Sequence, residues 1–297
     1  MTSGPSLPLL ECQLQPFEVR DSPPAAGCYP SWVNQYSAPG GQVWLSIARL
    51  GRGYLFHFPG LADFTWNPPA GPVACFPAPR ASPSTLLHLY RNQVAPMLAA
   101  GQGHLIFHAS AVVLPGGALA FLGAAGLGKS TLTASFSRSG ARFLADDCLM
   151  LAEEGDQVSA WPGLPGLRLW PDSARLLAVA FPRRSPKLRF EAAEVHLPTC
   201  EVPAPLRAVY LLAGPSSAIS IAPLAGAAAF AALSRHAFRL DPTDHPRLRA
   251  EFHAIASIAA RPLLYRLAFP RDFSLLSAVR QAILAHLSTL PPCSQIE

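Results

Sequence analysis

Lysine is nearly absent from this chain of 297 residues, which has 23 basic residues but only two lysines, Lys129 and Lys187. Arginine occupies almost every position at which a positive charge alone suffices, so each remaining lysine is a candidate for a chemical role. The net charge of +5 arises without a block of like charges. The sequence therefore predicts no nucleic-acid partner.

Paired cysteines are also missing. The six cysteines form no CxxC pair and have no histidine cluster beside them, which excludes the usual zinc and disulfide frameworks. They stand at positions 12, 28, 75, 148, 200 and 293. This distribution favours a reducing, cytoplasmic environment.

Export signals and membrane-spanning runs are absent as well. The amino terminus lacks the basic-then-apolar order of a signal peptide. The most apolar stretch, Ala218–Leu233, contains Pro223 and Gly226 and is shorter than the roughly 20 residues that span a bilayer. Because half of the residues are hydrophobic, we expect a globular protein with a sizeable core and no membrane span.

Proline and glycine, by contrast, are abundant and divide the chain into two parts. Short β-prone runs such as Gln42–Ala48 and Tyr54–Phe58 lie between turn signals, and Pro83–Ala100 has apolar residues at helical spacing. We predict a β-rich amino-terminal domain over residues 1–100, which ends in a bridging helix. An α/β domain is predicted over residues 101–290.

The second part begins with the element order that a phosphate site needs. Leu105–Leu114 and Ala118–Leu122 predict a hairpin, Thr131–Ser139 a helix, and Ala141–Ala145 a strand. Further elements are predicted with less detail: strands over Ala208–Ala213 and Leu263–Phe269, and helices over Leu224–Arg235, Pro246–Ala260 and Phe273–Leu287.

Between the hairpin and the helix, residues 123–130 match the phosphate-loop pattern GxxxxGK[ST] in full. Glycines allow backbone N–H groups to turn toward phosphates, and the helix amino terminus adds partial positive charge. We predict that ATP binds here, that Lys129 reaches its β- and γ-phosphates, and that the Ser130 hydroxyl holds Mg²⁺. A glycine-rich turn that merely caps the helix is the alternative. The predicted nucleotide-binding residues are Gly123, Ala124, Ala125, Gly126, Leu127, Gly128, Lys129, Ser130 and Thr131.

Two adjacent acids, Asp146 and Asp147, follow the strand predicted after the helix. A strand parallel to the one before the loop, and next to it, would place these carboxylates beside the loop. One could bind Mg²⁺ and the other could accept the proton of an attacking hydroxyl, although aspartates also cap turns at strand ends. His108 lies earlier, on the first strand of the hairpin, where a histidine alone is more often a packed or surface residue.

Taken together, the histidine-bearing strand, the hairpin, the loop, the short helix and the strand ending in Ala145, Asp146 and Asp147 resemble the catalytic domain of HPr kinase/phosphorylase. The resemblance is close over Phe107–Leu151. It implies an α/β fold with a phosphoenolpyruvate-carboxykinase-like, phosphate-loop kinase core.

The resemblance also implies roles for individual residues. Lys129 and Ser130 would contact ATP and Mg²⁺, and His108 would orient or tune the general base. One of the two aspartates would be that base and the other would assist the metal; we assign the base to Asp146 and the metal to Asp147.

The passage Gly166–Asp172, which includes Arg168, resembles shorter HPr-kinase-like proteins that accompany peptide-modification clusters, including those for lasso peptides. In some of these the acceptor is a serine of a precursor peptide. The EIRG segment and the carboxy-terminal glycine-rich stretch of true HPr kinases have no counterpart in this chain. The resemblance therefore does not extend to HPr as the acceptor or to reverse phosphorolysis.

A basic cluster after the aspartates comprises Arg183, Arg184, Lys187 and Arg189. It could stabilise charge on the transferred phosphoryl group or bind an acidic peptide, whereas a solvated loop is the alternative.

These observations predict a cytoplasmic, ATP- and Mg²⁺-dependent kinase whose leading acceptor is a serine of a peptide or protein. Two alternatives remain open: an ATP-binding switch or assembly module without kinase activity, and a kinase of small molecules. The sequence leaves homo-oligomer formation open.

Overall fold

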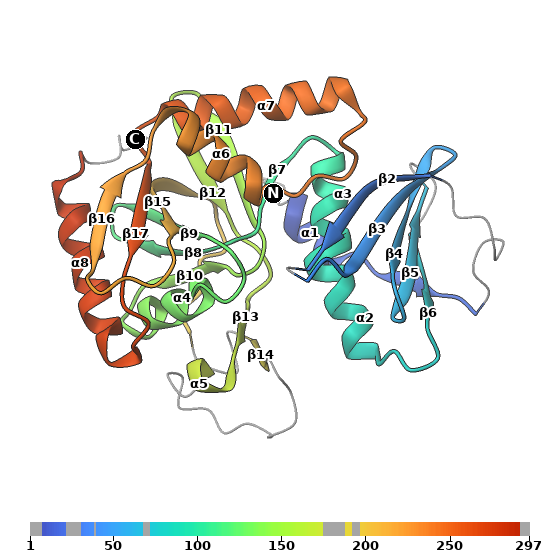
Figure 1. The fold of residues 1–297 in the computed structure, drawn as a ribbon, viewed down its shortest axis with the longest axis horizontal. Helices are drawn as coiled ribbons and strands as arrows, with labels where there is room; N and C mark the ends of the chain where they lie inside the picture. Colours follow the sequence, from blue (N-terminus) through green and yellow to red (C-terminus); the bar gives the residue numbers. More distant parts are fainter. Residues whose placement is uncertain are drawn as a thin grey trace, which may run out of the picture. The chain divides into compact units, whose positions relative to one another are not determined.

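The computed structural model shows a mixed α/β protein that contains two large sheets and divides into two compact units. The amino-terminal unit contains Pro8–His104 and Phe238–Glu251, and the loop unit contains Leu105–Ala237 and Phe252–Glu297 (Figure 1). The structure describes residues 8–21, 31–38, 40–67, 72–174, 188–191 and 197–291, with only the backbone for 188–191.

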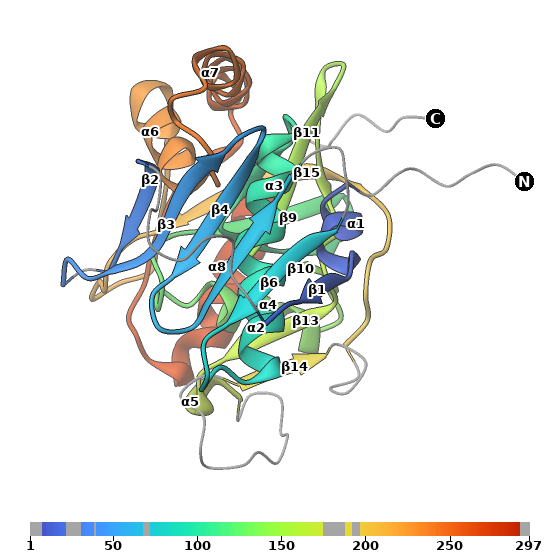
Figure 2. The same ribbon diagram turned by 90° about the vertical axis from the view of Figure 1, so that its right-hand side faces the viewer.

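The amino-terminal unit contains a six-stranded sheet of order β1-β6-β5-β4-β3-β2 (Figure 2). Neighbouring strands from β2 to β6 pair antiparallel, whereas β1 pairs with β6 in parallel. The strands are β1 (Phe17–Val19), β2 (Trp32–Ser37), β3 (Val43–Leu50), β4 (Gly53–Phe58), β5 (Ala62–Trp66) and β6 (Val73–Pro77). The described residues of this part of the chain are therefore rich in strands.

The helices of this unit are α1 (Pro8–Leu14), α2 (Pro83–Leu89), the π-helix η1 (Tyr90–Val94) and α3 (Ala95–Gly101). The last three follow one another without a break over Pro83–Gly101, where the sequence predicts helical spacing of apolar residues. The middle of this helical stretch widens into a π-turn because Pro96, at the start of α3, has no N–H to continue the regular hydrogen-bond ladder.

The segment Phe238–Glu251 belongs to the amino-terminal unit although it is distant from that unit in sequence. The Arg239 carbonyl oxygen accepts hydrogen bonds from Asn34 Nδ2 at 2.7 Å and from the Tyr36 hydroxyl at 2.8 Å. The Arg239 guanidinium pairs with the carboxylate of Glu251. Side chains of strand β2 therefore hold the segment by a backbone carbonyl oxygen of the segment.

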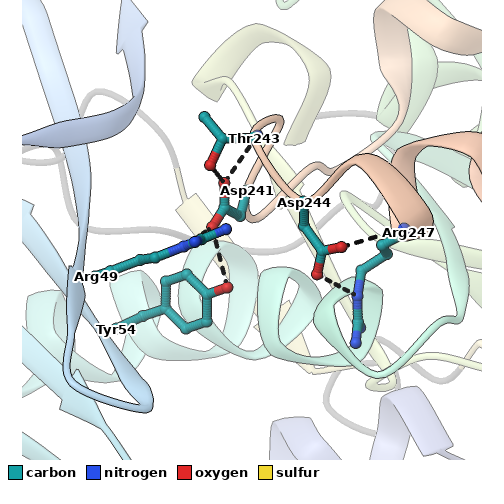
Figure 3. A network of polar contacts seen from close by, with 6 residues as sticks. All are labelled: Arg49, Tyr54, Asp241, Thr243, Asp244 and Arg247. Carbon is teal, nitrogen blue, oxygen red and sulfur yellow. Dashed lines mark hydrogen bonds and ion pairs between the residues drawn. The ribbon is translucent and has the colours of Figure 1, made fainter.

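Asp241 forms a second anchor of the same segment (Figure 3). Its carboxylate is 2% exposed and accepts hydrogen bonds from Arg49 Nε at 2.5 Å and the Tyr54 hydroxyl at 3.1 Å. The Thr243 N–H and hydroxyl also donate to it. Burial by itself raises the pKa of Asp241, but the bonds from Thr243, Arg49 and Tyr54 outweigh burial and lower it.

The loop unit is built on a nine-stranded sheet of order β10-β8-β9-β15-β12-β11-β7, in which β17 also pairs with β15 and β16 with β17. Its strands are β7 (Leu105–Phe107), β8 (Ala109–Leu114), β9 (Gly117–Leu122), β10 (Arg142–Ala145), β11 (Leu149–Glu154), β12 (Gln157–Trp161), β15 (Ala204–Leu212), β16 (Ser220–Pro223) and β17 (Leu264–Ala268). A separate pair is formed by β13 (Gly166–Leu169) and β14 (Leu188–Glu191).

Helices cover both faces of this sheet (Figure 1). Leu119 and Phe121 of β9 pack with α4 and α8, while Ala118, Ala120 and Leu122 pack with α6 and α7. Because both faces of β9 are buried, its sequence is continuously apolar. The helices are α4 (Lys129–Arg138), α5 (Pro171–Ala174), α6 (Gly226–His236), α7 (His245–Ala260), the 3-10 turn η3 (Phe273–Leu275) and α8 (Leu276–Thr289). Of α7, the residues from Phe252 onward belong to the loop unit.

Most downstream elements predicted from the sequence are confirmed with small shifts of their ends, but the hairpin differs. The predicted strand Leu105–Leu114 is two strands, because β7 pairs with β11 whereas β8 pairs with β9 and β10. His108 occupies the break between them. None of the helices in the described part of the chain is long and apolar enough to span a membrane.

The predicted position of the strand before the aspartates is also wrong in one respect. Strand β10 is not the neighbour of β9, because β8 lies between them and pairs antiparallel with both. Two antiparallel steps give β10 the same direction as β9. The carboxyl ends of both strands therefore lie at the same edge of the sheet, which is how Asp146 still reaches the loop.

Candidate phosphate-binding site

The loop between β9 and α4 depends on glycine at three positions. Gly123, Gly126 and Gly128 have φ of 148°, 80° and 98°, values that L-residues with side chains rarely adopt. A Cβ atom on Gly123 would also lie 3.2 Å from Leu212 Cβ and 3.3 Å from the Leu212 carbonyl oxygen. The backbone path thus favours glycine at the two glycine positions of the sequence pattern and at Gly126, which occupies one of its variable positions.

Lys129 begins α4, and its side chain turns back over the loop. The residue is 6% exposed, and its Nζ donates to the carbonyl oxygens of Gly123 at 2.7 Å and Ala124 at 3.3 Å. The ammonium group therefore lies against the first two residues of the loop. The hydroxyl of Thr131, one turn into the helix, lies 2.9 Å from the Ser173 hydroxyl of α5.

Asp146 directly follows β10 and meets the first turn of α4. The Ser130 hydroxyl donates to Asp146 Oδ1 at 2.8 Å, and the backbone N–H of Arg168 donates to Asp146 Oδ2 at 2.9 Å. Both carboxylate oxygens of this buried residue are therefore oriented by neighbours on α4 and β13. Arg168 therefore contacts the site through its backbone N–H, which binds Asp146, and through its side chain, which lies near Asp147.

Asp147 is the one residue other than glycine that has a positive φ, 65°, in the part of the chain that the structure describes. Its carboxylate Oδ2 lies 3.7 Å from Arg168 Nη1, and its carbonyl oxygen lies 3.0 Å from His108 Nδ1, which donates to it. His108 thus contacts the backbone of Asp147. Left-handed backbone at a residue with a side chain is costly and concentrates at functional sites.

His236, at the end of α6, is a neighbour of the site that sequence reasoning missed. Its carbonyl oxygen accepts a hydrogen bond of 2.7 Å from the His108 N–H, and Ala237 forms a β-bridge with Phe107. Burial and the nearby positive charges of Lys129 and His108 lower the pKa of His236 to about 4. Its imidazole is therefore neutral at pH 7. A lone histidine far along the chain carried no signal of this position.

The structure brings together most of the residues singled out from the sequence. Ser130 contacts Asp146, and Arg168 contacts both Asp146 and Asp147. Lys129 precedes Ser130 at the start of α4, and His108 contacts the carbonyl oxygen of Asp147. Of the predicted basic cluster, Arg183, Arg184 and Lys187 lie outside the described residues, and Arg189 is described only as backbone in β14.

The donor set of this site suits a magnesium ion that arrives with phosphate. Among the described residues, no group of three or more histidine, cysteine, aspartate or glutamate side chains could hold a metal by itself. Ser130 and Asp146 instead offer a hydroxyl and a carboxylate whose oxygens are 2.8 Å apart. Mg²⁺ in phosphoryl-transfer sites is held by one or two such protein oxygens together with substrate phosphates.

The structure shows an α/β protein with a glycine-rich loop that carries the sequence pattern of phosphate-binding loops. No protein-family model matches the chain, and no curated protein matches it. Among solved structures it is similar to the HPr(Ser) kinase/phosphatase from Coxiella burnetii, with 11% identity and a TM-score of 0.35 over 61% of this chain and 95% of that one. The function proposed below therefore rests on the site residues and not on this similarity.

Proposed function

We propose that this chain is an ATP- and Mg²⁺-dependent kinase that transfers the γ-phosphoryl group of ATP to a hydroxyl acceptor. The observation that carries the proposal is the 2.8 Å contact between Ser130 and Asp146, at the start of the helix that Lys129 begins and next to a second acid, Asp147. Phosphoryl transfer needs this combination of a cation, metal-binding oxygens and a proton acceptor.

Binding of the triphosphate is assigned to the loop and to the start of α4. The backbone N–H groups and the partial positive charge of a helix amino terminus favour an anion there. Lys129 Nζ donates to the loop carbonyl oxygens of Gly123 and Ala124, and such neutral acceptors are weaker partners for an ammonium group than phosphate oxygens. We expect its side chain to exchange these carbonyls for the β- and γ-phosphates.

The metal is assigned to Ser130 and Asp146, because these two side chains already share a hydrogen bond. This assignment reverses the one made from the sequence, in which Asp147 assisted the metal and Asp146 was the base. When bound, Mg²⁺ would neutralise negative charge on the phosphates. The Arg168 N–H holds the second oxygen of Asp146 and so orients the carboxylate toward Ser130.

Asp147 is then assigned the role of general base toward the acceptor hydroxyl. His108 holds its carbonyl oxygen, which fixes the left-handed backbone and hence the direction of the carboxylate. Arg168 lies beside that carboxylate with a side chain that is 25% exposed, so its guanidinium can also reach a phosphoryl oxygen. Positioning and electrostatics supply most of the catalysis in such reactions.

A serine of a peptide or protein is the acceptor that we propose. The support is the segment Gly166–Asp172, which resembles peptide-cluster kinases in sequence and which lines the site. Arg168, on strand β13 of this segment, contacts both aspartates. Ser173, on the following helix α5, contacts the hydroxyl of Thr131. The part of the chain that suggests a peptide acceptor is therefore adjacent to the proposed phosphoryl group.

The Lys129→Ala variant tests the proposal. With γ-labelled ATP and candidate serine-containing peptides, we expect this variant to lose at least about a hundredfold in kcat/KM, because removing one group that stabilises transition-state charge typically has this effect. Arg138→Ala, an exposed position at the other end of α4, is the matched control and should keep the wild-type rate. Circular dichroism should show both variants folded.

Three results would separate the proposal from its alternatives. Transfer of label to free sugars or amino acids, but to no peptide, would keep the kinase and replace the acceptor class. Tight ATP binding with no labelled acceptor of any kind would favour an ATP-dependent switch. If the wild-type protein failed to bind ATP in the presence of Mg²⁺, the proposed function would be wrong.

A further inference from the structure

The segment Phe269–Asp272, which follows β17, lies against the phosphate loop. Arg271 Nη1 donates a hydrogen bond of 2.6 Å to the carbonyl oxygen of Gly126. The ring of Phe269 lies beside Gly128, where an added Cβ would be 3.9 Å from Phe269 Cζ. Alternate residues of the segment therefore meet alternate glycines of the loop.

The order of the strands explains why the segment is found there. Strands β9 and β17 both pair in parallel with β15, so their carboxyl ends lie at the same edge of the sheet. The loop follows β9 and the segment follows β17. Ligands of α/β sheets bind outside the carboxyl ends of the strands, so residues from several such connections can take part in one site.

The segment is itself held in place on both sides of Arg271. The N–H of Ser216, in the connection after β15, donates to the Phe269 carbonyl oxygen at 3.3 Å. On the other side, Asp272 Oδ1 accepts a hydrogen bond of 2.8 Å from the Ser274 N–H at the start of η3. Arg271 is exposed, but it extends from a backbone that is anchored at both ends.

The contact with Gly126 fixes the direction of the next N–H group. In a trans peptide the C=O and the N–H point in opposite directions, so a Gly126 carbonyl held toward Arg271 turns the Leu127 N–H the other way. The Leu127 N–H is directed at the Ala124 carbonyl oxygen, 3.3 Å away, which also accepts from Lys129 Nζ at 3.3 Å. The N–H therefore points into the loop, on the same side as the ammonium group.

We propose that Arg271 is a positioning residue of the phosphate loop, which keeps the Leu127 N–H directed inward by holding the Gly126 carbonyl oxygen outward. This inference rests on the proposed binding of ATP. When Lys129 leaves the carbonyls of Gly123 and Ala124 for phosphate, the Arg271 contact remains on the outer side of the loop. It thus preserves the shape that the phosphates recognise.

The test compares Arg271→Met and Arg271→Lys with a control, Arg266→Met, an exposed arginine on β17. Amide hydrogen exchange of residues 124–128 is measured without nucleotide, and calorimetry gives the affinities for MgATP and inorganic tripolyphosphate. We expect faster exchange in Arg271→Met and about fivefold weaker binding of both ligands, which is typical of one lost hydrogen bond. Arg271→Lys should recover part of the affinity, the control should match the wild type, and all melting temperatures should agree.

Three results would overturn the inference. Wild-type affinity in Arg271→Met would show that the contact does not matter. Weaker binding with unchanged amide exchange would show that Arg271 touches phosphate directly, and weaker binding of ATP alone would place it on the nucleoside. A wild-type protein that binds neither ligand would instead overturn the proposed function, and this outcome is distinguishable because it requires no variant.

Discussion

At the scale of single residues, Asp147 has the backbone conformation that most needs explanation. Its positive φ turns two consecutive aspartates in different directions, so that Asp146 faces Ser130 while Asp147 faces Arg168. In a regular strand, adjacent side chains would also separate, but to opposite faces of the sheet. The left-handed turn keeps both acids within one site.

Two substitutions at this position separate chemistry from backbone strain. We expect Asp147→Asn and Asp147→Ala both to lose phosphoryl transfer, since neither can accept the acceptor's proton. Alanine should be less stable than asparagine by about 1 kcal/mol, because asparagine tolerates left-handed backbone better. Denaturant unfolding monitored by circular dichroism measures the difference. Equal stabilities of the two variants would argue against the strained conformation, and Asp156→Ala, in an exposed turn, serves as control.

At the scale of elements, the site arises where the end of one strand meets the start of one helix. Strand β9 leads into the loop and α4 leaves it, while β10 returns two strands away to deliver Asp146 to Ser130. Strand β15 lies on the other side of β9 and leaves no space beside the first loop residue. The sheet therefore leaves no room for a side chain at Gly123, whereas there is space for one at Gly126.

This difference predicts unequal effects of two glycine substitutions. Gly123→Ala meets both an unfavourable φ and close contacts with Leu212, so we expect it to destabilise the loop unit by about 2–3 kcal/mol. Gly126→Ala has an unfavourable φ but nothing within 4 Å of the added Cβ, and about 1 kcal/mol is expected. Thermal unfolding of the two variants provides the comparison. A Gly126 variant at least as unstable as the Gly123 variant would contradict this description of the loop.

At the scale of the whole molecule, the chain passes more than once between its two units. After leaving the amino-terminal unit at His104, it returns there for Phe238–Glu251. Buried Asp241, with its hydrogen bonds from Arg49 and Tyr54, is one polar anchor of the returning segment, and the Arg239 carbonyl oxygen is another. The amino-terminal unit therefore consists of two segments that are far apart in the sequence.

Asp241→Asn should accordingly destabilise the amino-terminal unit by about 2 kcal/mol at pH 7, since it weakens several hydrogen bonds to a buried charge. Asp244→Asn, its neighbour in Figure 3, removes a more exposed pair with Arg247 and should cost less than about 0.5 kcal/mol. The folded pKa of Asp241 lies below its ordinary value of 3.8, so the stabilisation is complete above that pH and is lost as the pH falls through the folded pKa.

The difference in unfolding free energy between the wild type and Asp241→Asn should therefore be constant from about pH 5 to pH 7 and shrink below about pH 4. Urea unfolding at several pH values measures it. A difference that grew as the pH fell would contradict the lowered pKa.

The local parts of the candidate site could be predicted because the physical requirements of a phosphate loop are met within a few consecutive residues. An apolar strand, glycines at the left-handed positions, and a helix that begins at Lys129 and Ser130 are all visible in order along the chain. The approximate ranges of the later helices were predicted from the same kind of local pattern.

Tertiary structure alone decided which partners meet that loop. The insertion of β8 between β9 and β10, the meeting of Asp146 with Ser130, and the nearness of His236 and Arg271 depend on pairings between segments far apart in the chain. The roles of two adjacent aspartates depend on one φ angle, which no periodic pattern reveals. Sequence therefore determined the path of the loop, and the order of strands in the sheet determined the residues that surround it, because only pairing brings distant side chains to one edge.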